Sequence, residues 1–426
     1  MKVYFIENNT KCPTLATRLN LMSVLAKYYE ITSNIEEADY IIADSCMCTQ
    51  VSINAAIKTL DSVFNNKSSH AKVLVAGCAA SMGKYYNLER DDVIIIPDKN
   101  IDAILKFLKL DEPLNQGRFN YEFDYRLEIL LTIGCLRKCS FCKMNYMDNG
   151  NQLKSLSLEE ISNILASAPG IPYSVTLSGV NTTEYGLDLA PYGKPKLHQV
   201  IEMLNNDSRV KWIFINGLHP GELYDNRELI SALLNNPKIK SLHIAVESAS
   251  DKILKLMNKG FTKAQLDFLF TLFRAERPEI YLDVHVLAGF PTEASKDREE
   301  TFAFLAKHNL PLFYKAVNMY GNTAGAPSSL LPQFDDAETS MIEDEYSEIQ
   351  LMAGQMMLEH PALNEGLVVG RIEAGKNPAL RTKLNIGEDV VYLDILTKLN
   401  MLNVAMQPKD REYNIGDVIL SKRPPK

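Results

Sequence analysis

RLEILLTIGCLRKCSFC, residues 126–142, joins a run of apolar residues to three closely spaced cysteines. The apolar part is short and rich in leucine and isoleucine, which predicts a buried β-strand. Cys135, Cys139 and Cys142 follow directly, so they lie on the loop at the carboxyl end of that strand. Three thiols are an odd number for disulfide bonds and one ligand fewer than a closed zinc or iron–sulfur site requires. The stretch therefore predicts a metal centre with an open coordination position.

Further strand patterns follow this one, and helical patterns separate them. This alternation from residue 126 to residue 320 predicts a partial (β/α)6 barrel, TIM-like in form, with its working face at the carboxyl ends of the strands. The three-cysteine loop follows the first strand and so lies on that face. The predicted strands are RLEILLTI, YSVTLSG, KWIFING, SLHIAVES, YLDVHVLAGF and LFYKAVNMY, and the predicted helices are SLEEISNILAS, KLHQVIEMLNN, RELISALLNN, the stretch Asp251–Ala275 and KDREETFAFLAKHN.

The first 112 residues show a second alternation, which predicts a parallel, flavodoxin-like sheet covered on both faces. Its strands are KVYFIEN, DYIIADS, KVLVAGC and DVIIIP, and its helices are TLATRLNLMSVLAKYY and NAAIKTLDSVF. Cys12, Cys46 and Cys78 each follow a different strand at the edge where parallel sheets bind ligands, so three thiols can converge there. Cys48 shares the face of Cys46 and is interpreted as a spare buried thiol, with a ligand role as the alternative.

The order of these patterns predicts an α/β protein in three parts. Residues 1–112 form the N-terminal domain, residues 121–335 the partial barrel, and residues 336–426 a helix followed by a small β-rich domain. The last part contains the strand-like segments EGLVVGRI, EDVVYLDIL and GDVILSK. A chain of 426 residues, 46% of them hydrophobic, is long enough to bury several cores.

Composition narrows the class of protein. The net charge is −8, so no general attraction to nucleic acid or to an anionic membrane is expected. No apolar run approaches the roughly 18 residues of a spanning helix, and the N-terminus shows no signal peptide, so the expected location is the cytoplasm. All seven cysteines lie in the first third of the chain, which in a reducing compartment favours metal binding over disulfides. A structural zinc site remains the alternative if a fourth ligand comes from elsewhere.

C-x-x-x-C-x-x-C with Phe141 before the last cysteine, on the first loop of a barrel, resembles the radical S-adenosylmethionine superfamily. The resemblance implies that Cys135, Cys139 and Cys142 hold a [4Fe–4S] cluster whose open iron binds S-adenosylmethionine. Reductive cleavage then yields a 5′-deoxyadenosyl radical, which abstracts a hydrogen atom from an unreactive C–H bond. A reducing donor such as flavodoxin or ferredoxin is the implied partner.

The N-terminal motifs KCPTLAT, ADSCMC and AGCAASM resemble those of the methylthiotransferases, a family of sulfur-group transferases. The resemblance implies that Cys12, Cys46 and Cys78 hold a second [4Fe–4S] cluster, which carries the sulfur to be inserted. Further segments follow in the family's order: SGVNTTEYGLDL, NGLHP, AVESASDKILKLMNKGFT, VLAGFPTE and YGNTAGAP. The chain departs from the family at a few places: Lys11, Leu15, Asp44, Ser45 and Glu247.

Contacts with S-adenosylmethionine are expected from Phe141, Ser178, Gly179, Glu247 and Gly289. All but Gly289 have a plainer alternative. Phe141 can plug the barrel mouth, and Ser178 with Gly179 can be a strand-ending turn. Glu247 can form an ion pair with Lys252 or Arg274. Gly289 permits close approach of the backbone to a ligand, and His219 is expected to cap or pack.

Known family members modify either a tRNA adenosine or an aspartate of a ribosomal protein. YGLDLAPYGKPKL resembles the protein-modifying branch. Residues 361–426 hold ten Lys and Arg against eight acidic residues, and a balance of +2 is weak for gripping tRNA. A protein or peptide substrate is therefore expected, with tRNA as the alternative substrate. The resemblance implies a C-terminal domain that is either TRAM-like or peptide-binding, and a monomer is expected.

Two other classes of protein remain as alternatives. An iron–sulfur electron carrier or sensor would not cleave S-adenosylmethionine on reduction. A cobalamin-dependent radical methylase also places an α/β domain before its barrel, but the chain has no Asp-x-His-x-x-Gly segment there.

Overall fold

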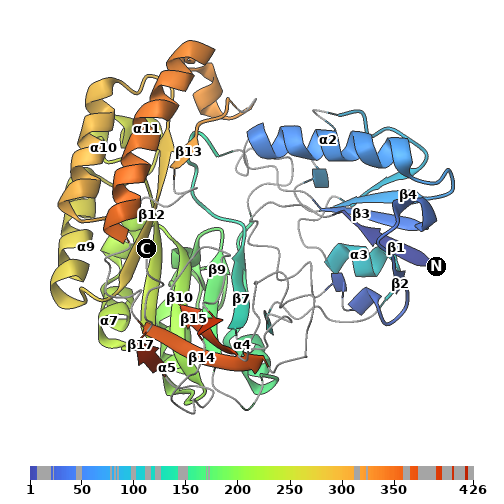
Figure 1. The fold of residues 1–426 in the computed structure, drawn as a ribbon, viewed down its shortest axis with the longest axis horizontal. Coiled ribbons are helices and arrows are strands. Elements are labelled where there is room, and N and C mark those ends of the chain that lie inside the picture. Colours follow the sequence, from blue (N-terminus) through green and yellow to red (C-terminus); the bar gives the residue numbers. More distant parts are fainter. Residues whose placement is uncertain are drawn as a thin grey trace.

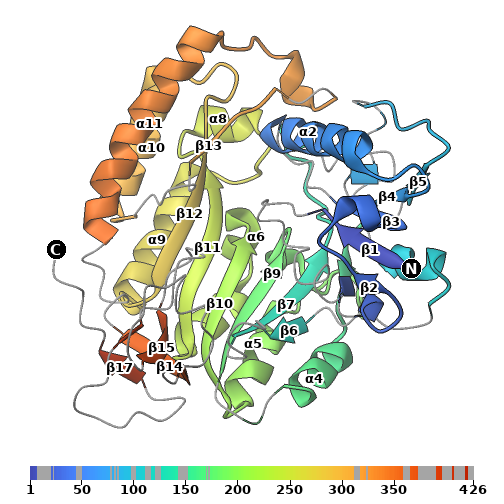
Figure 2. The same cartoon turned by 45° about the vertical axis from the view of Figure 1, so that its right-hand side comes forward.

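The computed structural model contains a parallel sheet near the N-terminus, a large curved sheet flanked by helices, and a small sheet near the C-terminus (Figures 1 and 2). The structure describes residues 1–6, 21–22, 24–44, 50–76, 79–80, 83, 86–96, 102–110, 117–119, 126–142, 152–168, 170, 173–310, 317–322, 325–357, 365–372, 390–395, 405–406 and 418–420.

The N-terminal sheet has the order β2-β1-β3-β4-β5, and all its strand pairs are parallel. Alternate residues of β4 enter two separate buried clusters, Val73 and Val75 in one and Leu74 and Ala76 in the other. Both faces of the sheet are therefore covered, as the sequence predicted. The elements are β1 Lys2–Phe5, β2 Glu30–Ile31, β3 Tyr40–Asp44, α2 Gln50–Asn66, β4 Lys72–Ala76, β5 Val93–Ile95 and α3 Asp102–Phe107.

The large sheet has the order β13-β12-β11-β10-β9-β7-β6, and its six predicted strands run parallel. β6 and β8 pair antiparallel with β7 and were not predicted. The strands are β6 Gly117–Phe119, β7 Arg126–Ile133, β8 Lys154–Ser155, β9 Tyr173–Gly179, β10 Val210–Leu218, β11 Ile239–Glu247, β12 Tyr281–Ala288 and β13 Val317–Met319. The predicted α/β class with a partial barrel is confirmed.

Helices cover one face of this sheet (Figure 2). The first begins at Ser157, whose hydroxyl accepts from the Glu160 N–H while the Glu160 carboxylate accepts from the Ser157 N–H, so the sequence itself defines the start. The helices are α4 Leu158–Ala166, α5 Leu197–Asn206, α6 Pro220–Asp225, α7 Arg227–Asn235, α8 Asp251–Leu256, α9 Lys263–Glu276 and α10 Ser295–Lys307.

The stretch Asp251–Ala275 differs from the prediction, because it forms two helices, α8 and α9, rather than one. The break is a turn in which Asn258 and Gly260 have φ of 56° and 73°. Left-handed backbone cannot continue a right-handed helix, and glycine adopts it without strain. This turn matters because it contacts the three-cysteine loop.

α11 (Asp336–Met357) packs against the barrel, with Ile342 and Tyr346 buried in the barrel core. Beyond it, an antiparallel sheet has the order β16-β15-β14-β17. Its strands are β14 Glu365–Ile372, β15 Val390–Ile395, β16 Ala405–Met406 and β17 Val418–Leu420. The domain boundaries and the type of the C-terminal module stay predictions.

Candidate active site

The three-cysteine loop begins where β7 ends. Gly134 turns the chain with φ of 81°, and a Cβ at this position would overlap the carbonyl oxygen of Gln152. Only glycine fits such a turn. Cys139 is buried, Cys135 and Cys142 are partly buried, and the Cys142 N–H donates to the Cys139 carbonyl at 3.1 Å. The loop thus lies at the carboxyl end of the first barrel strand, as predicted.

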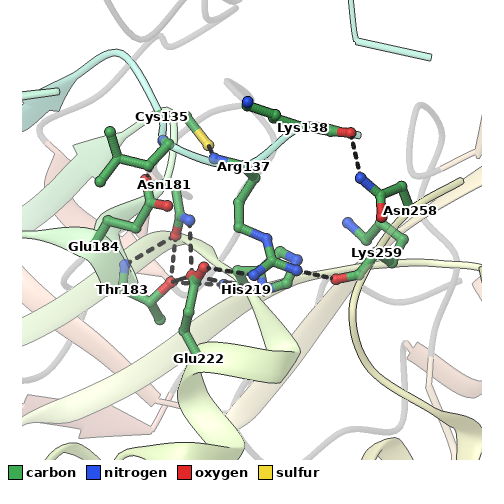
Figure 3. A network of polar contacts seen from close by, with 11 residues as sticks. Cys135, Arg137, Lys138, Asn181, Thr183, Glu184, His219, Glu222, Asn258 and Lys259 are labelled. Atoms are coloured by element: carbon green, nitrogen blue, oxygen red, sulfur yellow. Dashed lines mark hydrogen bonds and ion pairs between the residues drawn. The ribbon is translucent and has the colours of Figure 1, made fainter. Parts of the chain in front are cut away.

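One side of the loop is held by residues that follow β9 and β10 (Figure 3). The Leu136 N–H donates to the Glu184 carboxylate at 2.8 Å. Glu222, on α6, lies at the centre of the network: its carboxylate accepts from the Thr183 hydroxyl at 2.7 Å and from the Asn181 amide at 2.8 Å. The guanidinium of Arg137 forms an ion pair with Glu222 at 3.4 Å.

The other side of the loop is held by the turn between α8 and α9. The Arg137 guanidinium donates to the carbonyl of Lys259, and the Asn258 amide donates to the carbonyl of Lys138 at 2.8 Å. The Ser140 N–H donates to the carbonyl of Met257 at 2.9 Å. Because neighbouring elements bind both sides, the cysteine positions depend on tertiary contacts as well as on the local turn.

The thiols lie in a buried environment with cations nearby. Burial raises the pKa of Cys139, and the charge of Lys259 opposes this shift. Burial, followed by the Glu184 carboxylate, raises the pKa of Cys135. Thiolates are therefore disfavoured until a bound metal supplies positive charge.

Three thiols on one loop, with Lys259 and Arg137 beside them, fit an anionic iron–sulfur cluster. Within the described residues, no three His, Cys, Asp or Glu side chains are grouped as for a single metal ion. A [4Fe–4S] cluster binds each cysteine to a different iron, so it does not require that grouping.

Glu247 lies at the end of β11 with φ of 64°, a conformation that is uncommon for a residue other than glycine. Its carboxylate is 3.8 Å from the ammonium of Lys259, a buried residue. The predicted partners Lys252 and Arg274 were therefore wrong. Lys252 pairs with Asp297 at 2.7 Å, and Arg274 donates to the carbonyl of His308 at 3.0 Å, because the turn after α8 brings Lys259 closer.

The other predicted cofactor residues lie around the same barrel end. Phe141 packs against the buried cluster Ile253, Met257, Leu287 and Phe290. Ser178 and Gly179 end β9, and a Cβ on Gly179 would overlap the Thr132 hydroxyl. Gly289 has φ of 70°, and its N–H donates to the Glu293 carboxylate at 2.8 Å.

His219 precedes α6 without capping it through its side chain. Its ring lies edge-on to Phe261, with 5.3 Å between centroids. Burial, and then the charges of Lys259 and Arg137, hold its pKa well below the usual range. The neutral ring packs, which is one of the two predicted roles.

Sequence reasoning missed Glu184, Glu222 and Lys259 as site residues. Burial raises the pKa of Glu184 to about 7. Glu184 and Lys259 lie in the quoted segments SGVNTTEYGLDL and AVESASDKILKLMNKGFT, which were the available signal, whereas nothing marked Glu222.

Cys12, Cys46 and Cys78 lie outside the described residues. The strands that precede them, β1, β3 and β4, are adjacent and parallel, so their carboxyl ends share one edge of the N-terminal sheet. Convergence of the three thiols stays a prediction. Among the helices that the structure describes, none is both long enough and apolar enough to cross a bilayer.

Two family models match the chain. Residues 129–305 match the radical SAM superfamily, and residues 16–96 match uncharacterized protein family UPF0004. The ribosomal protein uS12 methylthiotransferase RimO of Acetivibrio thermocellus is 28% identical, with 76% of this chain and 76% of that protein covered. The corresponding protein of Clostridium botulinum is also 28% identical, over 74% of each. The tRNA-2-methylthio-N(6)-dimethylallyladenosine synthase of Thermotoga petrophila is 28% identical over 64% of each.

Solved structures share the fold. The radical S-adenosylmethionine methyltransferase TsrM of Kitasatospora setae, with tryptophan and a SAM analog bound, gives a TM-score of 0.53 over 77% of this chain and 75% of that one. A second TsrM structure, with cobalamin and a [4Fe-4S] cluster, gives 0.50 over 75% and 71%. Both are 12% identical to this chain, so the likeness concerns the fold alone.

Proposed function

The chain belongs to the radical S-adenosylmethionine methylthiotransferase family as a divergent member, and on this premise we propose that it inserts a methylthio group into a polypeptide side chain. The target is an unactivated C–H bond of an aspartate-like residue in a ribosomal protein or a ribosomally made peptide. The observation that carries the proposal is the three-cysteine loop, held at the carboxyl end of a parallel barrel strand by Glu184, Glu222 and the turn after α8.

The cofactors of this family are S-adenosylmethionine and [4Fe–4S] clusters. Together they supply a carbon-centred radical for hydrogen abstraction, and sulfur and a methyl group for insertion. In this chain, Cys135, Cys139 and Cys142 would hold one cluster, and Cys12, Cys46 and Cys78 the other. The second trio is assigned from the motif resemblance and from the shared edge of β1, β3 and β4.

The remaining residues orient the cysteine loop, bind S-adenosylmethionine and exclude water. Arg137 fixes the loop by joining Glu222 to the Lys259 carbonyl, so the cysteine positions do not depend on the bound group. Glu247 and Lys259 form the charged pair beside Cys139, and we expect them to meet the amino and carboxylate groups of S-adenosylmethionine. Phe141 closes the barrel mouth with its apolar neighbours and keeps water from the reacting atoms.

The choice of a polypeptide over tRNA is supported by the relatives named for ribosomal protein uS12 and by the weak positive charge of residues 361–426. The second candidate, a tRNA adenosine, is favoured by the relative named as a tRNA-modifying synthase. Both substrates are cytoplasmic, in line with the expected location. A flavodoxin or ferredoxin donor and a monomeric state stay predictions.

The proposal is tested with anaerobically reconstituted protein, S-adenosylmethionine and dithionite. Purified uS12 and unmodified tRNA are offered in separate reactions, and each is analysed for added methylthio mass, while 5′-deoxyadenosine is measured by chromatography. We expect methylthio mass on an aspartate of uS12 and none on tRNA. The Cys135/Cys139/Cys142→Ala variant should release no 5′-deoxyadenosine.

The two alternatives give different results in the same assay. Methylthio mass on tRNA but not on protein would move the substrate to the second candidate. Wild-type protein that holds iron but releases no 5′-deoxyadenosine would identify an electron carrier or sensor and would overturn the enzymatic proposal.

A further inference from the structure

Two histidines lie on the inner face of the barrel, away from the covering helices. On β11, Ile244 and Val246 are fully buried in the core against the helices, whereas His243 on the opposite face is only partly buried. On β12, Val284 and Val286 are fully buried in the same core, and His285 is again partly buried on the opposite face. β11 and β12 are adjacent parallel strands (Figure 2).

The two rings contact each other. Their centroids are 4.7 Å apart and their planes are inclined by 84°. The Gly217 N–H donates to Nδ1 of His243 at 3.2 Å. A neutral imidazole that accepts at Nδ1 carries its proton on Nε2, so His243 is fixed as an N–H donor at its far ring nitrogen.

The pair lies below the cysteine end of the barrel. Leu287, two residues beyond His285, belongs to the buried cluster against which Phe141 packs. Glu247, four residues beyond His243, lies near Lys259 and Cys139. At about 3.3 Å per residue, His285 is roughly 7 Å below Leu287 along the strand, and His243, in register with Asp283, is roughly 13 Å below it. A side chain that enters the lumen beneath the cysteine loop would therefore meet them.

We propose that His243 and His285 form the subsite that binds the carboxylate of the substrate aspartate. The proposal rests on the proposed function and specifies its substrate class. Asp283, buried and in register with His243, places one carboxylate beside two imidazoles. The second imidazole suits a carboxylate acceptor brought by the substrate, and an N–H to carboxylate hydrogen bond is strong when shielded from water.

The test measures binding rather than turnover. Fluorescence anisotropy compares a labelled uS12 peptide that contains the target aspartate with the same peptide carrying asparagine. The variants are His243→Leu and His285→Leu, which remove the ring N–H groups and leave no donor for a carboxylate at either position. Wild type should bind the aspartate peptide about tenfold more tightly than the asparagine peptide, as loss of one charge-assisted hydrogen bond implies. The double variant should bind both peptides alike.

His198→Asn is the matched control, because His198 lies on α5 outside the barrel lumen, and this variant should keep the preference. Circular dichroism and iron content establish that each variant is folded. A preference that persists in the folded double variant, or that is absent in wild type, would overturn the subsite. Failure of the proposed function is seen separately: the aspartate preference would be present and histidine-dependent, yet no methylthio mass would appear on uS12.

Discussion

At the residue scale, the cysteine loop depends on a few side chains with several partners each. Glu222 accepts from Thr183 and Asn181 and pairs with Arg137, so one carboxylate links two barrel loops to the cluster loop. Arg137 in turn reaches the carbonyl of Lys259. Such a network is fully satisfied only when all its members are in place, which makes it a sensitive point for substitution.

Gly260→Ala should loosen the three-cysteine loop. Gly260 has φ of 73°, and a Cβ there would overlap the Arg137 guanidinium. We expect a stability loss of about 1–2 kcal/mol from the strained backbone, together with faster loss of iron because Arg137 is displaced. Denaturant unfolding and the rate of iron release to a chelator measure the two effects.

Gly193→Ala is the control, because Gly193 has φ of 79° but no atom lies within 4 Å of the added Cβ. It should lose similar stability and retain iron as wild type does. Equal iron release from both variants would show that the Arg137 contact does not hold the loop.

At the scale of elements, α11 is joined to the turn after β12 by a buried carboxyl group. Glu293 accepts from the Gly289 N–H at 2.8 Å, and the Tyr346 hydroxyl of α11 donates to it at 3.4 Å. Arg298 of α10 pairs with Glu345 of α11 at 2.6 Å. The helix after the barrel thereby supports the segment that we expect to contact the cofactor.

Glu293→Gln should flatten the dependence of stability on pH. Burial raises the pKa of Glu293 to about 7. Between pH 5 and 7 the folded protein keeps a proton that the unfolded chain has released, so stability falls as pH rises through this window. The wild type should lose on the order of 3 kcal/mol more than the variant between pH 5 and 8. Urea unfolding at a series of pH values measures the difference.

Glu299→Gln on α10 provides the comparison, because the Glu299 side chain is exposed. Its curve should follow that of wild type. Parallel wild-type and Glu293→Gln curves would mean that the buried carboxyl group keeps no proton in the folded state.

At the scale of the whole molecule, the described residues form a parallel sheet with its own two cores and a barrel with another. The six assigned cysteines are divided in the same way. Three follow strands β1, β3 and β4 of the N-terminal sheet, and the other three follow strand β7 of the barrel. We infer a division of labour: radical formation at the barrel and sulfur supply at the N-terminal sheet.

A Cys12/Cys46/Cys78→Ala variant should separate radical formation from sulfur supply. Iron should fall from about eight to about four per chain, as loss of one four-iron cluster requires. The variant should still release 5′-deoxyadenosine but should add no methylthio group to uS12. Cys48→Ala is the matched control and should keep the full iron content. Full iron in the triple variant would contradict the N-terminal assignment.

Much of the architecture was predictable, because strand and helix patterns differ in period. RLEILLTI became β7, and YSVTLSG became β9. The missed helices and strands were short: β2, β6, β8, β16, α3 and α6 have six residues or fewer, too few to show a period. The turn at Asn258 and Gly260 was missed because the apolar positions on its two sides read as one helical stretch.

The sequence alone determined the three-cysteine loop, its place after a parallel strand and the family, because cysteine spacing and strand pattern are local properties of the chain. The tertiary structure alone decided that Lys259 pairs with Glu247, that Glu222 holds Arg137, and that His243 meets His285. These contacts join residues 12 to 85 positions apart in the sequence. Such pairs are set by the register of neighbouring strands and the turns after them, which no local pattern of residues records.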